Sequence, residues 1–176
     1  MAPEGDLWIF AYGSLMWRPG FAALERRPAL LHGHRRRLCI LSEHYRGTKE
    51  RPGLVLGLDA GGACRGVAYR VARDLKEATL AAVRAREMLG GVYREDWPQV
   101  ELDDARIVLA LSYFAQPLHP RYASEMPPET VLSLVRQGCG AMGTNADYVL
   151  NTHDHLAAMG VFDPELGWLA QRLRAE

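Results

Sequence analysis

The chain has 176 residues, of which 48% are hydrophobic and 24% are charged. This apolar content is enough to bury a core, which excludes a disordered chain. Lys and Arg together number 21, as do Asp and Glu. The net charge is therefore zero, without the strong positive field that attracts nucleic acids or anionic membranes, and we expect neither as a partner.

The cysteines and the apolar runs indicate where the protein works. Cys39, Cys64 and Cys139 are odd in number, far apart and without a C-x-x-C pair. This pattern argues against a disulfide framework or a zinc knuckle and favours reduced thiols. Apolar runs fall short of the roughly 18 residues that span a bilayer. Residues 1–6 are acidic, where a secretory signal peptide would be basic. Together these features predict a cytoplasmic protein.

The first third of the chain is typical of strands. Residues 7–12 form a short apolar run that ends at Gly-Ser, which predicts a buried strand entering a loop. Residues 29–41 predict a long strand with a basic middle. Residues 54–58 and 64–71 predict two more strands, joined across Gly61-Gly62.

The hydrophobic period then changes to that of a helix over residues 74–88. Asp74 with Glu77 three residues later resembles a capping box. Gly90 and Gly91 follow the last apolar position and would end the helix.

After this helix the pattern is strand-like again and then helical. Residues 92–102 and 106–114 predict two strands with a turn at Asp103-Asp104. Three helices are expected after residue 120, opening at Pro127-Pro128-Glu129, at Thr144 with Asp147, and at Asp163-Pro164-Glu165. Because the strands precede most of the helices, the sequence favours an α+β fold. We find no linker within residues 1–176 and therefore expect a single domain.

A glycine motif near residue 140 imitates a dinucleotide-binding fingerprint. Residues 138–143 spell G-x-G-x-x-G, and Asp163 lies 20 residues after Gly143. The fingerprint needs a strand before it and a helix and strand after it, whereas residues 127–137 are helical in pattern. We interpret the motif as a Gly-rich connection between helices and expect no nucleotide cofactor.

Two histidine pairs and an arginine run are candidate binding sites. His32 and His34 could share one face of a strand, but His153 and His155 fall in a predicted helix and do not. A metal site needs three or four converging ligands, so we expect none. The arginines at 35–37 alternate in direction along a strand and are interpreted as solvated side chains, one with an ion-pair partner.

The turn after the first strand is a candidate binding loop. Tyr12, Gly13, Ser14 and Leu15 follow a buried strand, and successive backbone N–H groups in such a turn can bind an anion. A plain strand-end turn explains the pattern as well. Ser14 lacks the G-x-S-x-G context of a hydrolase nucleophile.

Glu87 has an unusual place for a carboxylate. It lies in the last turn of the predicted helix, where the helix dipole is negative and cations are preferred. A carboxylate there is destabilised as an anion, and partial burial would raise its pKa further, toward the range of a general base. Arg84 and Arg86 could offset this effect, and an ordinary surface glutamate accounts for the pattern equally well.

Five blocks of sequence occur in a diagnostic order from residue 7 to about residue 170. They are WIFAYGSLMW at 8–17, HYRGT at 44–48 with Pro-Gly at 52–53, RGVAYR at 65–70, REM at 86–88 followed by GVY at 91–93, and GTNADY at 143–148. In this order they resemble the ChaC-type γ-glutamylcyclotransferases, a glutathione-degrading family, and REMLGG is similar to its bacterial branch.

The resemblance implies a fold, a reaction and a set of site residues. The fold is a small mixed β-barrel with flanking helices. The family's catalytic glutamate corresponds to Glu87, and its γ-glutamyl-binding loop to Tyr12, Gly13, Ser14 and Leu15. Two family tyrosines near the pocket correspond to Tyr93 and Tyr148. The expected reaction is cyclisation of the γ-glutamyl group of glutathione to 5-oxoproline with release of Cys-Gly, which requires no cofactor and no metal.

Two other functions stay open. A cyclotransferase for other γ-glutamyl amino acids or amines would carry the same glutamate and loop. A non-catalytic binding module on the same scaffold is the alternative from another class, because fold does not determine function. Glu87 beside an intact Tyr12–Leu15 loop argues against the binding module.

Overall fold

The structure is a computed structural model that describes residues 4–175, so residues 1–3 of the acidic start lie outside it. The chain divides into two compact units. Unit 1 comprises Met1–Arg36 and Leu58–Gln116, and unit 2 comprises Arg37–Gly57 and Pro117–Glu176. The single domain over residues 1–176 stays a prediction.

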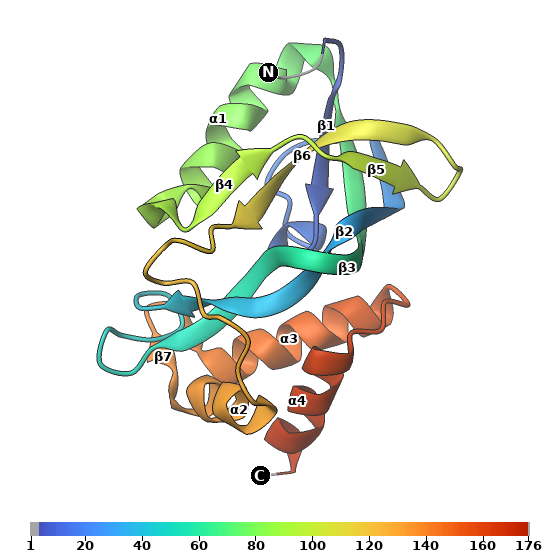
Figure 1. The fold of residues 1–176 in the computed structure, drawn as a ribbon. Coiled ribbons are helices and arrows are strands. Elements are labelled where there is room, and N and C mark those ends of the chain that lie inside the picture. Colours follow the sequence, from blue (N-terminus) through green and yellow to red (C-terminus); the bar gives the residue numbers. More distant parts are fainter. Residues whose placement is uncertain (1–3, 176) are drawn as a thin grey trace. The chain divides into compact units, whose positions relative to one another are not determined.

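Unit 1 is built on a closed β-barrel of mixed strand direction (Figure 1). β1 pairs antiparallel with β3 and parallel with β6, so the strand order β1-β3-β2-β5-β6 returns to its start, and β4 pairs antiparallel with the part of β6 that follows its pairing with β5. The strands are β1 Leu7–Ala11, β2 Glu25–Ser42, β3 Gly53–Val71, β4 Tyr93–Asp96, β5 Gln99–Leu102 and β6 Ile107–Ala115.

The core of unit 1 lies inside this barrel. Phe10, Leu31, Leu58, Val100 and Phe114 are among its buried members and come from all five strands of the ring. In β5 buried and exposed residues alternate, as expected when one face of a strand meets a core and the other meets solvent. The barrel is therefore filled by side chains.

β3 corrects one prediction from the sequence. Residues 54–58 and 64–71 belong to a single strand, not to two strands joined by a turn. Gly61 and Gly62 have φ of +96° and +69° and lie within β3, where they produce a bend instead of a hairpin. Gly33 has φ +78° in the middle of β2, the neighbouring strand of the sheet. Gly61 and Gly62 do change the direction of the chain, but they form a bend within a long strand.

The helix of unit 1 begins two residues later than predicted. A 3₁₀ turn, η2 (Arg73–Leu75), precedes α1 (Lys76–Glu87). The N-cap is Leu75, without a side-chain hydrogen bond, so the predicted Asp74–Glu77 capping box is wrong. The 3₁₀ turn has already taken Asp74 into helical geometry. The helix ends at Glu87, and Gly90 and Gly91 follow with positive φ within η3 (Leu89–Gly91), as the sequence indicated.

The strand predicted over residues 92–102 is divided in two. β4 ends at Asp96 and β5 begins at Gln99, with Trp97-Pro98 between them. Proline has no N–H for a sheet ladder, which explains the interruption. The predicted turn at residues 103–104 is confirmed, and Ala105 closes it with φ +66°.

Unit 2 contains α2 (Pro128–Gln137), α3 (Asn145–Ala158) and α4 (Pro164–Arg174). The predicted starts are confirmed. Thr144 accepts a hydrogen bond from the Asp147 N–H, and Asp163 accepts one from the Leu166 N–H. Residues 138–143 form the connection between α2 and α3, within a small hairpin of β7 (Cys139–Gly140) and β8 (Gly143–Thr144).

The start of β3 is held to α3 within unit 2. The Asn145 side-chain amide bonds both backbone groups of Leu54, accepting from its N–H at 2.6 Å and donating to its carbonyl at 2.7 Å. The Tyr148 hydroxyl accepts from the Leu56 N–H at 3.1 Å. Gly53 permits this approach, because a Cβ there would lie 2.3 Å from the Arg46 carbonyl oxygen.

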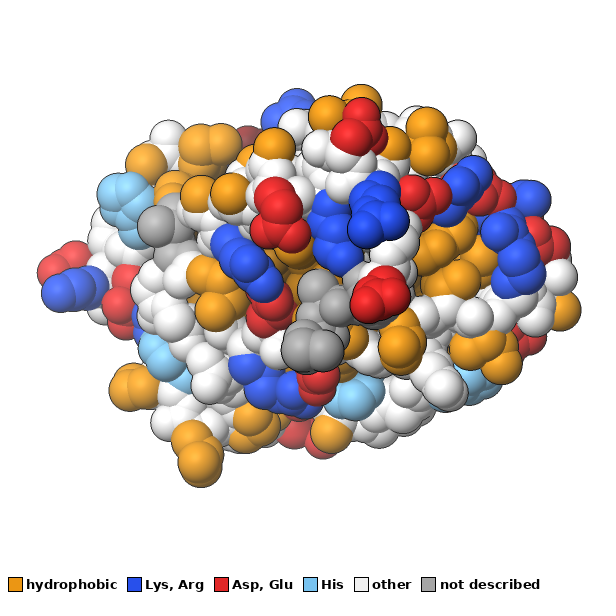
Figure 2. All heavy atoms as spheres, turned by 90° about the horizontal axis from the view of Figure 1, so that it is seen from above, with side chains coloured by type: hydrophobic (Ala, Val, Ile, Leu, Met, Phe, Trp, Pro, Cys, Tyr) orange, Lys and Arg blue, Asp and Glu red, His pale blue; other side chains and the backbone are white. Residues whose placement is uncertain are grey.

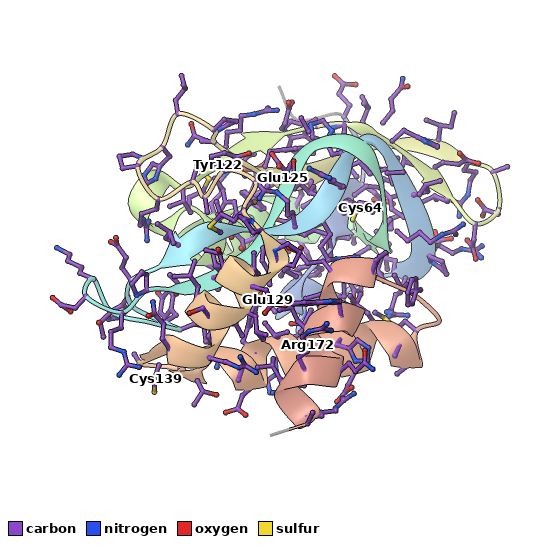
Figure 3. All side chains as sticks on the ribbon, turned by 60° about the horizontal axis from the view of Figure 1, so that its bottom comes forward. Cys64, Tyr122, Glu125, Glu129, Cys139 and Arg172 are labelled. Carbon is purple, nitrogen blue, oxygen red and sulfur yellow. The ribbon has the colours of Figure 1, made fainter. Side chains whose placement is uncertain are left out.

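The remaining features concern cysteines and membranes. Cys39 and Cys64 are buried free thiols, and Cys139 is an exposed free thiol after α2 (Figure 3). Within residues 4–175, none of the helices has the length and apolar character needed to cross a bilayer. The predicted α+β class, a small mixed β-barrel with flanking helices, is confirmed.

Candidate active site

Glu87 lies at the C-terminal end of α1, as the sequence indicated, and is mostly buried. Its side chain is 22% exposed. Burial is the main cause that raises the pKa of the carboxyl group above its ordinary value, and the Arg86 guanidinium, 3.1 Å from Oε1, acts against it. The expected direction therefore holds, with desolvation of the carboxylate as its leading cause.

The predicted binding loop is a tight turn directly after β1. Residues Ser14–Met16 form the 3₁₀ turn η1. The Gly13 carbonyl accepts from the Met16 N–H at 2.9 Å, and the Ser14 carbonyl accepts from the Arg18 N–H at 2.9 Å. The first amides of such a turn, on Ser14 and Leu15, have no acceptor inside it. The loop therefore presents backbone donors beside a half-buried Ser14.

Arg86 joins this loop to the end of α1. One guanidinium nitrogen donates to the Ser14 hydroxyl oxygen at 2.7 Å, and another donates to the Arg18 carbonyl at 2.7 Å. The same guanidinium contacts Glu87. The structure thus brings Glu87 and the Tyr12–Leu15 loop together within unit 1. Sequence reasoning missed this role and considered Arg86 only as a charge near Glu87.

Arg36 supports the loop from β2, and its burial corrects the prediction of a solvated side chain. It is 9% exposed, not solvated, and donates to the Tyr12 carbonyl and to the Arg65 carbonyl, both at 2.6 Å. Arg37 is also buried, and within unit 2 it donates to the Ala123 carbonyl at 2.8 Å and to the Tyr122 hydroxyl (Figure 3). Backbone carbonyls therefore accept hydrogen bonds from both buried guanidinium groups.

Strands β4 and β6 add a polar face to the same site. Glu95 is paired directly with Tyr113 in the antiparallel ladder, and such pairs project from the same face of a sheet. Tyr93 is two residues from Glu95 on β4 and shares this face. Arg84 binds both carboxylate oxygens of Glu95 at 2.7 Å. Because Arg84 and Glu87 lie three residues apart on α1, this ion pair holds the Glu87 side of the helix over the β4–β6 face.

Two predicted tyrosines have defined partners. The Tyr12 hydroxyl donates to the Tyr113 carbonyl at 2.9 Å, which links the loop to β6. Tyr148 belongs to unit 2, where its hydroxyl accepts from Leu56 and its ring faces the Arg46 guanidinium at 5.4 Å. The roles predicted for Tyr12, Gly13, Ser14, Leu15, Tyr93 and Tyr148 in substrate binding stay predictions.

The charge on the surface is mixed. On the face shown in Figure 2, acidic and basic side chains alternate with hydrophobic ones, in agreement with the zero net charge. In the part of the chain that the structure describes, no three His, Cys, Asp or Glu side chains gather as metal ligands. His32 contacts Glu101 at 3.4 Å, and the His34 ring packs edge-on against Phe114.

Comparison with known proteins shows the relationships of the chain. The model of the ChaC-like protein family matches residues 7–176. The chain belongs to this family. A relative from Escherichia coli (strain K12), glutathione-specific gamma-glutamylcyclotransferase, is 38% identical over 163 residues, which cover 93% of this chain and 71% of the relative. Human glutathione-specific gamma-glutamylcyclotransferase 1 is 34% identical over 89% of this chain and 74% of its own.

The fold has a counterpart among solved structures. The crystal structure of a yeast γ-glutamyl cyclotransferase specific to glutathione matches this chain with a TM-score of 0.87. The match covers 98% of this chain and 97% of the yeast chain at 19% sequence identity. The γ-glutamylcyclotransferase-like fold that the sequence blocks implied is therefore confirmed.

Proposed function

We propose that this ChaC-like protein is an enzyme that converts glutathione to 5-oxoproline and Cys-Gly, with Glu87 as the general acid and base. The observation that supports the proposal is that the Arg86 guanidinium contacts both the Ser14 hydroxyl of the Tyr12–Leu15 loop and Glu87, a mostly buried carboxyl group with a raised pKa. Names of the Escherichia coli and human relatives support glutathione as the substrate.

The reaction is an intramolecular transfer. The α-amine of the γ-glutamyl group attacks its own side-chain carbonyl carbon, and a new C–N bond closes a five-membered ring. The amide bond to the cysteine nitrogen then breaks. Atoms balance without water, because the attacking nitrogen loses two protons between the ammonium ion and the lactam N–H, and the leaving cysteine nitrogen gains two between the amide N–H and an ammonium ion.

Glu87 supplies the proton path in this proposal. The attacking amine is an ammonium ion at neutral pH and must lose a proton before it can attack. The raised pKa of Glu87 makes the carboxylate a stronger base than a surface glutamate, and the protonated form then returns the proton to the leaving nitrogen. The Arg86 guanidinium acts against this rise of the pKa and favours the carboxylate form.

The loop supplies binding and orientation. Donors on Ser14 and Leu15 would hold the folded-back γ-glutamyl group and stabilise the negative charge that develops on its carbonyl oxygen. Arg36 and Arg86 keep the loop in shape by binding the Tyr12 carbonyl and the Ser14 hydroxyl. Tyr93 projects from the same face of the sheet as Glu95 and would line the pocket. The proposal includes a small-molecule substrate and a cytoplasmic location for the enzyme.

The test is incubation of the purified protein with glutathione, and separately with γ-glutamyl-alanine, without metal or nucleotide. We expect 5-oxoproline and Cys-Gly from glutathione. Product from γ-glutamyl-alanine alone would keep the chemistry and change the substrate to other γ-glutamyl compounds. No product from either would favour the binding module.

Substitution of Glu87 tests the role of the carboxyl group. Glu87→Gln should lower kcat/KM by at least ~100-fold, because general acid–base catalysis contributes that much. Glu77→Gln is the matched control, since Glu77 is an exposed glutamate on the same helix and should leave the rate unchanged. A folded Glu87→Gln variant with full activity would contradict the assignment.

A further inference from the structure

Tyr113 of β6 has a buried hydroxyl group without a partner. The residue is 2% exposed, and its hydroxyl oxygen has no hydrogen-bond partner among the residues that the structure describes. Buried polar groups in folded proteins are nearly always hydrogen-bonded, and each exception needs an explanation. Nearby Tyr69 shows the ordinary case, because its hydroxyl donates to the Met16 carbonyl at 2.6 Å.

The unpartnered hydroxyl belongs to the face that α1 covers. Tyr113 is paired with Glu95 across the β4–β6 ladder, so both side chains project from the same side of the sheet. Arg84 of α1 binds Glu95, and Glu87 lies three residues further along that helix. The phenol also interacts electrostatically with the carboxylates of Glu95 and Glu87. Burial first, and then Glu95 and Glu87, raise the pKa of Tyr113 above its ordinary value, so the phenol is neutral at physiological pH.

We propose that the Tyr113 hydroxyl contacts the reacting nitrogen of the γ-glutamyl substrate and accepts a hydrogen bond from its N–H. The inference rests on the proposed function, in which the substrate atom that meets Glu87 is first the attacking amine. The Tyr113 hydroxyl lies on the sheet face that Arg84 and the end of α1 cover, so a nitrogen that meets Glu87 comes to this face too. A neutral phenol has a lone pair for the N–H and a proton that it can donate to a carboxylate at the same time.

This contact would orient the amine for attack. An ammonium ion that loses its proton to Glu87 keeps two N–H bonds, and a fixed acceptor for one of them directs the nitrogen lone pair. Orientation of reacting groups is a large component of intramolecular catalysis. The unpartnered hydroxyl of the free protein is consistent with an atom whose partner arrives with the substrate.

The test is Tyr113→Phe, which removes the hydroxyl group and keeps the ring. We expect kcat/KM for glutathione to fall about 10-fold or more, the effect of one lost hydrogen bond in a dry site. The variant should melt at the same or a higher temperature, because the hydroxyl has no protein partner to lose. Tyr69→Phe is the matched control for stability and should melt a few degrees lower, roughly 2–4 °C, since its hydroxyl has a buried acceptor.

A second ligand identifies the atom that Tyr113 contacts. Glutaryl-cysteinylglycine is glutathione without its α-amino group, and it cannot cyclise. Its inhibition constant should be the same within about 2-fold in wild type and Tyr113→Phe, since the α-amino N–H that Tyr113 would bind is missing. Weaker inhibition of the variant would overturn the contact with the amine, and an unchanged kcat/KM for glutathione would overturn the role of Tyr113 altogether.

Failure of the proposed function would look different. In that case wild-type protein would form no 5-oxoproline from glutathione. The affinity for glutathione, measured by calorimetry, would then test the Tyr113 contact. Weaker binding by Tyr113→Phe than by wild type would support the contact. Equal binding by the two proteins, or no binding by either, would overturn it. If the wild type is active and Glu87→Gln is not, only the Tyr113 inference is at risk in the Tyr113→Phe experiment.

Discussion

Two tyrosine hydroxyls in this protein show opposite ways of using a buried polar group. In unit 2, the Tyr148 hydroxyl accepts a hydrogen bond from Leu56, and Asn145 beside it bonds both backbone groups of Leu54. In unit 1, the Tyr113 hydroxyl lies on the Glu87 side of the sheet without a partner from the described residues. The first arrangement stabilises the fold, and the second leaves a polar group ready for a ligand.

The same contrast distinguishes two of the sequence blocks on which the family resemblance rests. The block at residues 143–148 contains Thr144, Asn145 and Tyr148, whose side chains cap α3 and hold β3. The block at 86–88 contains Arg86 and Glu87, which join α1 to the loop after β1. Family resemblance alone assigns both blocks to the site. Their contacts give the first block a structural use, and the substrate role of Tyr148 stays a prediction.

The largest effect on stability is expected from Asn145→Ala. The substitution leaves the N–H and the carbonyl of fully buried Leu54 without partners, which should cost about 2–5 kcal/mol in the free energy of unfolding. Chemical denaturation measures this loss. Asn151→Ala, at an exposed position of the same helix, is the control. Equal losses from both variants would mean that the Asn145 contacts do not stabilise the fold.

Gly53→Ala tests how closely the backbones of unit 2 approach one another. A Cβ at Gly53 would lie 2.3 Å from the Arg46 carbonyl oxygen and 2.7 Å from the Asn145 amide oxygen, so backbone must shift. We expect a loss of about 1–3 kcal/mol from overpacking. Gly167→Ala within α4 is the opposite case, with only ordinary contact to Phe162 at 3.8 Å, and should gain about 0.5–1 kcal/mol. Thermal denaturation of both variants gives the two signs.

Tyr148→Phe sharpens the comparison of the two hydroxyls. It removes the acceptor of the Leu56 N–H, a buried group, and should lower stability by about 1–2 kcal/mol. Tyr113→Phe should leave the free energy of unfolding unchanged. Denaturation of the two variants under the same conditions is the measurement, and equal losses would contradict the contrast between the units.

The smallest effect is a pH dependence caused by Glu87. Its pKa is raised in the folded protein, so folding favours the protonated carboxyl group. That stability is fully present below the unfolded-state pKa and is lost as the pH rises through the folded-state pKa. Glu87→Gln should therefore be more stable than wild type at neutral pH, with the advantage disappearing under acidic conditions. Melting curves across this pH range measure it, and an advantage that grows toward acid would show the wrong sign.

The same raised pKa predicts how the rate depends on pH. Because the base must be ionised to accept a proton, kcat/KM should fall as the pH is lowered through the Glu87 pKa. The acid limb of the profile should lie above the ordinary range of a glutamate. An acid limb at the value of an exposed carboxyl group would contradict burial as the cause.

Much of the secondary structure could be predicted, because its signals are local. The run at residues 7–12, the proline at the start of α2 and the caps at Thr144 and Asp163 each act within one turn of chain. Prediction failed where a local signal has two solutions. Gly61-Gly62 could form a turn or a bend, and the long pairing of β3 with its neighbours selected the bend.

By itself, the sequence determined the α+β character, the position of Glu87 at a helix end, the loop after β1 and, through the order of its blocks, the family. Only the tertiary structure decided that β1 and β6 close the barrel, that Arg36 is buried on carbonyls and that Arg86 bonds Ser14. It alone brought Tyr113 to the face that Glu87 covers. The physical reason is that local propensity depends on neighbours along the chain, whereas burial and hydrogen-bond partners depend on residues that only folding brings together.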